Sequence, residues 1–185
     1  LDMRMDVSQE LSAKEVINDY GYEELLKIFY EYAEESNSKK IAETIVNNRP
    51  IQTTNELVSV IESSLPRQNP KFTKSTVRKI FQAVRIEVNN EISEIIESLD
   101  TVKNFIKSNG IMVFLSYHSI EDRTIKQFIE KETKGCTCDP KLAICICENV
   151  PLFKLGKYKK RKPSNNEIKK NPRSKSAVLR FMVKI

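Results

Sequence analysis

The chain has 185 residues, 39% of them hydrophobic and 30% charged, with 4 Gly, 7 Pro and a net charge of +6. These values are typical of a packed globular protein and exclude collagen-like, low-complexity and disordered chains. The longest apolar run, residues 111–115, is much shorter than the roughly 20 residues that a membrane-spanning helix needs, so we expect no membrane partner.

The first hundred residues predict several short amphipathic helices. The patterns Ser12-x-x-Glu15 and Thr53-x-x-Glu56 are capping boxes that mark two helix starts. Apolar residues at helical spacing indicate further helices within 25–46. A small helical bundle is therefore expected.

A longer helix of several turns is predicted from Val77 to Leu99, where apolar residues recur every three or four positions. Its opposite face carries a stripe of hydrogen-bonding side chains at the same spacing: Arg78, Gln82, Arg85 and Asn89. We interpret this stripe as a means of holding a loop or a ligand, and a solvated helix face is the alternative.

The periodicity changes after Asn109-Gly110, which marks a turn. The continuous apolar run 111–115 predicts a strand covered on both faces. Ser119 with Asp122 then resembles a helix cap, and we expect the helix to cover 120–132. Loops between a strand and a helix often line a ligand site in α/β proteins.

The C-terminal part carries the positive charge. Residues 1–100 contain 12 Lys and Arg against 18 Asp and Glu, whereas residues 101–185 contain 19 against 7. Such a surplus suits a polyanion, and a solvated loop is the alternative. At the end of the chain, alternation over 177–184 predicts a last strand with Arg180 on the face opposite its apolar residues.

Four sequence motifs follow one another in a characteristic order. They are Leu-Asp-Met-Arg-Met-Asp at 1–6, Phe-Gln-Ala-Val-Arg-Ile-Glu-Val-Asn-Asn-Glu at 81–91, Ser-Tyr-His-Ser-Ile-Glu-Asp-Arg at 116–123 and Asn-Pro-Arg-Ser-Lys-Ser-Ala at 171–177. With them the whole chain resembles the MraW-type family of S-adenosylmethionine-dependent methyltransferases, which modify the exocyclic N4 of a cytidine in bacterial 16S ribosomal RNA.

The resemblance implies a Rossmann-like methyltransferase core that is interrupted by a helical substrate-recognition insertion. We therefore expect an α/β protein in three parts. Residues 1–10 would end the first core segment, residues 11–74 would form the all-helical insertion, and residues 75–185 would form the C-terminal core segment with a basic, cysteine-containing loop region.

The resemblance also implies that the cofactor, S-adenosylmethionine, is held by a glycine-containing loop and acidic strand ends upstream of the first motif. Because the chain starts with Leu1 and contains no glycine-rich loop, we expect a truncated part of the enzyme that is inactive by itself and has no cofactor-binding residue. The alternative function is a non-catalytic fragment that binds ribosomal RNA without the cofactor.

The partners implied by the resemblance are 16S ribosomal RNA or the small ribosomal subunit, and a homodimer stays open. The start of the chain has no signal-peptide pattern, and all four cysteines lie between 136 and 147, which suits a reduced compartment better than a disulfide-stapled secreted protein. We expect a cytoplasmic protein.

The nitrogen lone pair of the target amine is delocalised into the cytosine ring. Catalysis therefore requires groups that accept hydrogen bonds from the two hydrogens of this amine. The carboxylates of Asp2, Asp6, Glu121 and Asp122 are candidates, because resemblance places both of their motifs near the family's active site. His118 is a candidate for base binding or proton removal. A structural ring and a simple helix cap are the alternatives for His118 and Asp122.

The candidates for RNA binding combine the polar stripe with basic and hydroxyl residues of the later motifs, and ion pairs with neighbouring carboxylates are the alternative for the arginines. Tyr117 stands where the family usually has Phe, and it either stacks on a base or belongs to the core. The full set is Arg78, Gln82, Arg85, Asn89, Ser119, Arg123, Lys160, Arg161, Arg173 and Ser174.

The four cysteines form the pattern Cys-x-Cys-x6-Cys-x-Cys. Four thiols in one segment can bind structural Zn²⁺, although zinc ligands are usually separated by two or more residues within each pair. Reduced thiols or a disulfide are the alternatives, and we favour no metal at Cys136, Cys138, Cys145 and Cys147.

Overall fold

The computed structural model describes residues 1–66, 70–136, 138, 144, 147, 150–156 and 160–185. The chain divides into two compact units, Leu1–Glu91 and Ile92–Ile185. Each has its own buried core. None of the helices formed by the described residues is both long and apolar enough to cross a bilayer.

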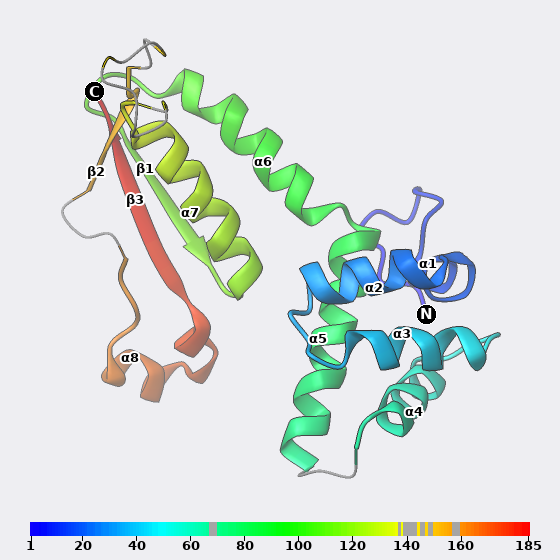
Figure 1. The fold of residues 1–185 in the computed structure, drawn as a ribbon. Coiled ribbons are helices and arrows are strands. Elements are labelled where there is room, and N and C mark those ends of the chain that lie inside the picture. Colours follow the sequence, from blue (N-terminus) through cyan, green and yellow to red (C-terminus); the bar gives the residue numbers. More distant parts are fainter. Residues whose placement is uncertain (67–69, 137, 139–143, 145–146, 148–149, 157–159) are drawn as a thin grey trace. The chain divides into compact units, whose positions relative to one another are not determined.

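The first unit is a helical bundle. It contains α1 (Ala13–Asp19), α2 (Tyr22–Glu31), α3 (Ser38–Asn47), α4 (Thr54–Ser64) and α5 (Pro70–Val88), and α5 packs against α1, α2 and α4 (Figure 1). The predicted capping boxes are present at Ser12 and Thr53, where each N-cap side chain accepts from a backbone NH of the first turn. The expectation of several short helices is confirmed.

The core of this bundle is made by the apolar stripes of its helices. Phe29, Leu25, Ile41 and Ile61 are fully buried, and α5 contributes Ile80. Burial of one such side chain contributes about 1.5–3 kcal/mol. The bundle is therefore held by its own core.

The predicted single helix from Val77 to Leu99 is wrong. The chain instead forms two helices, α5 and α6 (Glu91–Val102), and Asn90 between them has a φ of 50°. Asparagine tolerates this left-handed conformation because its short polar side chain bonds locally. The apolar spacing continues on both sides of the break, so periodicity alone could not show it.

The second unit is an antiparallel sheet with helices. Its strands are β1 (Ile111–Ser116), β2 (Phe153–Leu155) and β3 (Val178–Lys184), in the order β1-β3-β2. The helices are α6, α7 (Ser119–Thr133) and α8 (Asn165–Lys170), with short 3-10 turns η1 (Lys103–Phe105) and η2 (Pro172–Ser176). The predicted last strand is confirmed as β3.

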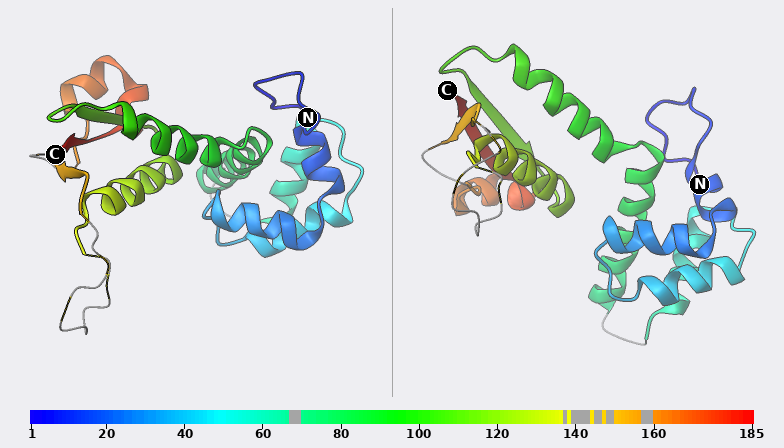
Figure 2. Two further views of the ribbon diagram at one scale, coloured as in Figure 1. Left: turned by 90° about the horizontal axis from the view of Figure 1, so that it is seen from above. Right: turned by 45° about the horizontal axis from the view of Figure 1, so that its top comes forward.

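Helix α7 lies along one face of this sheet and contacts all three strands (Figures 1 and 2). Met112 and Phe114 of β1 face it and meet Phe128 of α7 in the core, which also contains Phe153 and Met182. In the register of β1 and β3, Phe114 stands opposite Arg180. Arg180 therefore lies on the same face of the sheet as α7.

The expectation that the strand at 111–115 is covered on both faces is wrong for the described residues. Its alternate side chains Ile111, Val113 and Leu115 are 59%, 61% and 53% exposed. Their partners across the ladder on β3 are also apolar, so this side of the sheet is an apolar surface. A continuous apolar run shows that both faces of a strand are apolar, and it does not show what covers them.

Phe153→Ala tests the core of the second unit. The ring is fully buried, so its removal is expected to cost about 3–5 kcal/mol of unfolding free energy, because transfer free energy and a cavity add. Urea denaturation followed by circular dichroism measures this loss. The matched control is Phe105→Ala, whose ring is 79% exposed and whose loss should stay within about 0.5 kcal/mol. Equal losses for both variants would contradict the described core.

Candidate functional site

The loop after β1 is closed by the first turn of α7. His118 is the N-cap, and its Nδ1 accepts a hydrogen bond from the backbone NH of Glu121 at 3.3 Å. The Glu121 carboxylate accepts in return from the backbone NH groups of Tyr117 at 2.8 Å and His118 at 3.4 Å. The predicted cap formed by Ser119 with Asp122 is therefore wrong, since the helix begins at Ser119 and the histidine caps it.

Glu121 is held as an anion by this arrangement. The adjacent His118 ring and the NH groups of the loop lower the pKa of the Glu121 carboxyl from 4.5 to about 2, against the effect of burial. His118 Nε2 is 3.1 Å from Glu121 Oε1, but the two atoms are not aligned as a hydrogen bond, and this buried nitrogen has no other partner within the described residues. The carboxylate thus fixes the backbone of the loop.

Asp122 joins α7 to the sheet. Its oxygens accept from Arg180 Nε at 2.7 Å and from Arg180 Nη2 at 3.0 Å, and Lys160 Nζ lies 3.5 Å away. Arg180, followed by Lys160, keeps the pKa of the Asp122 carboxyl below its usual range. Reciprocally, Asp122 raises the pKa of Arg180. Both side chains are largely buried, so this is a fixed structural pair.

Tyr117 is not a core residue. Its side chain is 53% exposed at the end of β1, between buried Ser116 and the cap His118. Ser119 and Arg123 are also exposed on the first turn and a half of α7. The rigid loop therefore presents an aromatic ring beside polar and basic side chains, which suits a nucleobase and its phosphate.

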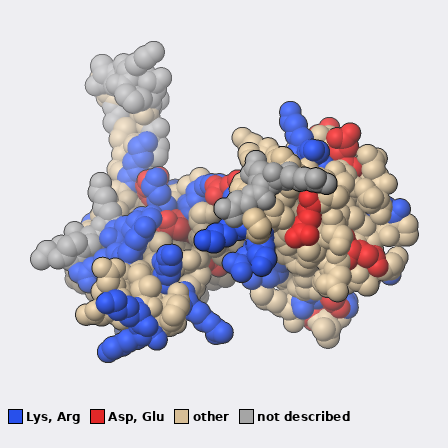
Figure 3. All heavy atoms as spheres, turned by 90° about the horizontal axis from the view of Figure 1, so that it is seen from below, with Lys and Arg blue, Asp and Glu red and all other residues tan. Residues whose placement is uncertain are grey.

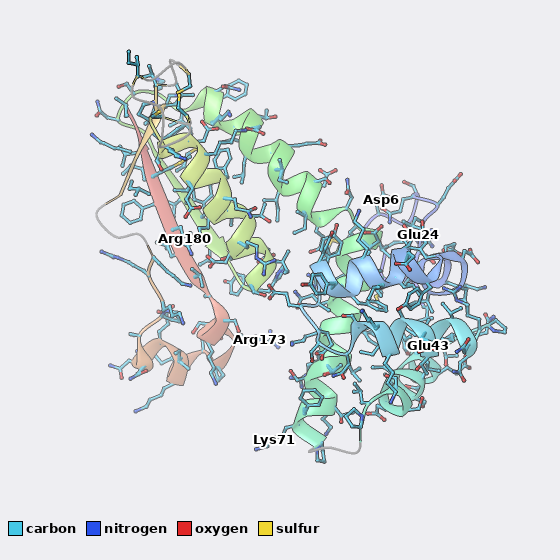
Figure 4. All side chains as sticks on the ribbon, in the orientation of Figure 1. Asp6, Glu24, Glu43, Lys71, Arg173 and Arg180 are labelled. Atoms are coloured by element: carbon cyan, nitrogen blue, oxygen red, sulfur yellow. The ribbon has the colours of Figure 1, made fainter. Side chains whose placement is uncertain are left out.

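The predicted basic residues near the C-terminus surround the same sheet. Arg161 makes a two-bond antiparallel bridge with Leu179 of β3, and this contact brings Lys160 to Asp122. Arg173 is exposed on η2, the turn that precedes β3 (Figure 4). Ser174 is buried, and its hydroxyl donates to the backbone oxygen of Asn171. Ser174 thus shapes the turn on which Arg173 stands.

Figure 3 shows Lys and Arg side chains gathered on the part of the chain formed by residues 92–185. The blue side chains there outnumber the red ones on this face. This distribution agrees with the charge of the sequence, in which residues 101–185 hold most of the basic residues. A surface of this kind attracts phosphates without reading a base sequence.

In the first unit, Asn89 of the polar stripe holds the N-terminal loop. Asn89 Oδ1 accepts from the backbone NH of Met5 at 2.7 Å, and Asn89 Nδ2 donates to the backbone oxygens of Met3 at 2.9 Å and Arg85 at 2.8 Å. Arg85 forms a two-point ion pair with Glu91 at 2.7 and 3.0 Å. The loop-holding interpretation of the stripe therefore fits Asn89.

The other two members of the stripe lie nearer the middle of α5. Arg78 is exposed and Gln82 is half-buried. Their predicted contact with RNA stays a prediction.

The two N-terminal carboxylates also make local contacts. Asp2 forms a two-point ion pair with Arg4, which lowers the pKa of the Asp2 carboxyl to about 2. Asp6 accepts from the backbone NH and the hydroxyl of Ser8, and these contacts lower its pKa as well. Asp6 lies exposed at the N-terminal loop (Figure 4). Their predicted role as acceptors stays a prediction.

The model of the MraW methylase family matches residues 1–185. The chain belongs to the MraW methylase family. Among curated relatives, it is 42% identical over 188 residues to a ribosomal RNA small subunit methyltransferase H of Caldicellulosiruptor saccharolyticus, and 40% identical over 185 residues to that of Dehalococcoides mccartyi strain 195. The whole chain is matched in both, and it spans 61% and 52% of their lengths.

Membership of the MraW methylase family agrees with the resemblance seen in the four motifs. The structure brings the third motif together with Arg180 and Lys160, and it brings the first motif together with Asn89 of the second. Sequence reasoning missed Arg180 as the partner of Asp122, although it expected this arginine to face away from the apolar side of its strand. The signal was a charged residue flanked on both sides by apolar residues of its strand.

The pKa of Glu121 predicts a pH effect on stability. A carboxyl whose folded pKa is depressed contributes stability that is complete above the unfolded pKa near 4.5 and is lost as the pH falls toward about 2. Glu121→Gln is expected to lower the unfolding free energy at neutral pH and to lose less of it over that acid range than the wild type. Urea denaturation at a series of pH values measures both effects.

Glu130→Gln is the matched control on the same helix, because the Glu130 carboxylate is 61% exposed. This variant should follow the wild-type pH profile within about 0.5 kcal/mol. If Glu121→Gln did the same, the carboxylate would not hold the loop as described.

Proposed function

We propose that this chain contributes the target-nucleotide loop and part of the RNA-binding surface of an S-adenosylmethionine-dependent methyltransferase that acts on the N4 of a cytidine in 16S ribosomal RNA. Family membership supports methyl transfer, and the printed names of the relatives support ribosomal RNA of the small subunit as the substrate. The observation that carries the proposal is the loop 116–123, where an exposed Tyr117 stands on a backbone fixed by Glu121.

The residues of the loop differ in whether their polar atoms already have partners within the protein. Glu121 and Asp122 bind the backbone and Arg180, so we assign them as positioning residues. Tyr117 would stack on the target base, and His118 would orient the loop through its cap. Alignment matters here because the N4 amine is a weak nucleophile that must be held in line with the methyl group.

The cofactor would supply the electrophilic methyl group, and we assign no residue of this chain to its binding. The two glycines next to strands of the second unit have other roles. Gly110 ends the turn before β1, and a Cβ on Gly156 would lie 1.9 Å from the Phe181 ring, so Gly156 allows close packing. The cofactor site would then belong to the part of the relatives that this chain does not match.

The competing function is RNA binding without catalysis by this chain. The basic surface favours RNA binding under both hypotheses, so binding alone does not separate them. Separation requires an assay in which the remaining part of a relative is present.

A chimera provides this assay. In the relative from Caldicellulosiruptor saccharolyticus, the matched region is replaced by residues 1–185, and methyl transfer to small-subunit RNA is measured with labelled S-adenosylmethionine. The chimera is expected to methylate a cytidine at N4, as shown by mass spectrometry of the nucleosides. Methylation at another atom or base would overturn the assignment of the target, and an inactive but folded chimera would favour the non-catalytic alternative.

Tyr117→Ala in this chimera is expected to reduce the methylation rate about 5- to 150-fold, because a base-stacking contact contributes about 1–3 kcal/mol. Tyr117→Phe keeps the ring and should retain most of the activity. The control Tyr30→Ala removes a 73% exposed tyrosine of α2 and should leave the rate unchanged. Equal rates for Tyr117→Ala and Tyr30→Ala would remove Tyr117 from the site.

The basic surface is tested with the 185-residue chain itself. Arg173→Ala and Arg123→Ala are each expected to weaken binding to small-subunit RNA. Each should also reduce the slope of the logarithm of the binding constant against the logarithm of the salt concentration by about one, as the loss of one phosphate contact does. Fluorescence anisotropy at several salt concentrations measures this slope. Lys40→Ala removes an exposed charge of α3 as the control, and an unchanged slope in the two arginine variants would contradict the proposed surface.

A further inference from the structure

Three cysteine sulfurs meet in the segment between α7 and β2. The Sγ atoms of Cys136, Cys138 and Cys147 all lie within 4.8 Å of one another, although Cys147 is eleven positions from Cys136. Cys145 lies outside the described residues. Convergence of thiols from both ends of one segment needs a cause, because sulfur atoms by themselves attract one another only weakly.

The spacing of the sulfurs fits a tetrahedral metal ion. Cys136 Sγ and Cys147 Sγ are 3.8 Å apart, which is much longer than the roughly 2.05 Å of a disulfide bond. In a tetrahedral zinc site with Zn–S bonds of about 2.3 Å, two sulfur ligands are about 3.8 Å apart. The distance between these two sulfurs matches that edge of the tetrahedron, and Cys138 Sγ lies within 4.8 Å of both.

The short spacing of the first pair also has a structural role. The backbone NH of Cys138 donates to Cys136 Sγ at 3.4 Å, so the one-residue spacing directs an amide at the sulfur. Hydrogen bonds of this kind stabilise a negative charge on sulfur and orient a metal ligand. This contact answers the objection that zinc ligands are usually separated by two or more residues.

We propose that Cys136, Cys138 and Cys147 bind one Zn²⁺ as a structural site, with a further ligand completing the tetrahedron. Thiolates are soft ligands and favour zinc over magnesium or calcium. The ion would connect the end of α7, which lies two residues before Gly135, to the segment that leads into Phe153 of β2. Since no histidine lies near these cysteines in the sequence, the site is structural and independent of the proposed methyl transfer.

The test uses the 185-residue chain without a polyhistidine tag, purified in a phosphine reductant. Elemental mass spectrometry is expected to find about one zinc per chain. After chelation, added Co²⁺ is expected to give the thiolate-to-cobalt charge-transfer band of a tetrahedral site, and Zn²⁺ should remove that band. The triple variant Cys136→Ser, Cys138→Ser, Cys147→Ser is expected to hold on the order of tenfold less zinc and to show no band.

The control is Ile144→Ser, which changes a 77% exposed side chain of the same segment and should retain the zinc and the cobalt band. The cobalt spectrum is read on the wild-type chain, so the result does not depend on the folding of the triple variant. Zinc content in the wild type no higher than in the triple variant, with no cobalt band, would overturn the proposal. A mass two hydrogens lower without reductant, combined with no metal uptake after reduction, would assign these thiols to a disulfide instead.

Discussion

The ion pair between Asp122 and Arg180 is the contact on which the candidate loop depends. It joins the first turn of α7 to the middle of β3, and the two side chains are only 16% and 11% exposed. Two parallel hydrogen bonds define both the distance and the orientation of the guanidinium against the carboxylate. Because His118 and Glu121 belong to the same turn as Asp122, the position of the cap follows from this pair.

A largely buried ion pair of this kind fixes the relative position of the two elements more than it increases the net stability of the fold. Removing two charges from water costs free energy that their attraction only partly returns. Loss of one partner is far more costly, because a buried charge is then left without compensation. Substitution of Arg180 alone is therefore expected to be costly. The same strand also forms backbone hydrogen bonds with Arg161, and these bring Lys160 close to Asp122.

Several helices and strands of the described residues were predictable, because their starts and periodicity depend on local residue order. Capping boxes and apolar spacing located α1 and α4, and alternation located β3. The break at Asn90 was not predicted, since the apolar spacing of α5 and α6 continues across it. The exposed face of β1 was not predicted either, because the hydrophobicity of a strand face does not show which other residues pack against it.

The sequence motifs identified candidate residues, but they did not show which polar atoms of those residues already have partners. Motif residues are recognised by type, whereas a role depends on which atoms already have partners. Asn89 uses its amide oxygen and nitrogen to hold Met3, Met5 and its own helix, so a residue that was a candidate for RNA binding holds the N-terminal loop.

The same reasoning separates the residues of the third motif into those whose polar atoms are engaged within the protein and those whose side chains are exposed. Glu121 and Asp122 have their oxygens engaged within the protein, and a carboxylate with a pKa of about 2 is a poor proton acceptor at neutral pH. The Tyr117 side chain, by contrast, is 53% exposed at the end of β1. A partly buried carboxylate that holds the backbone of an exposed aromatic residue restricts the conformations of that residue before any ligand arrives, and preorganisation of this kind lowers the entropy cost of binding.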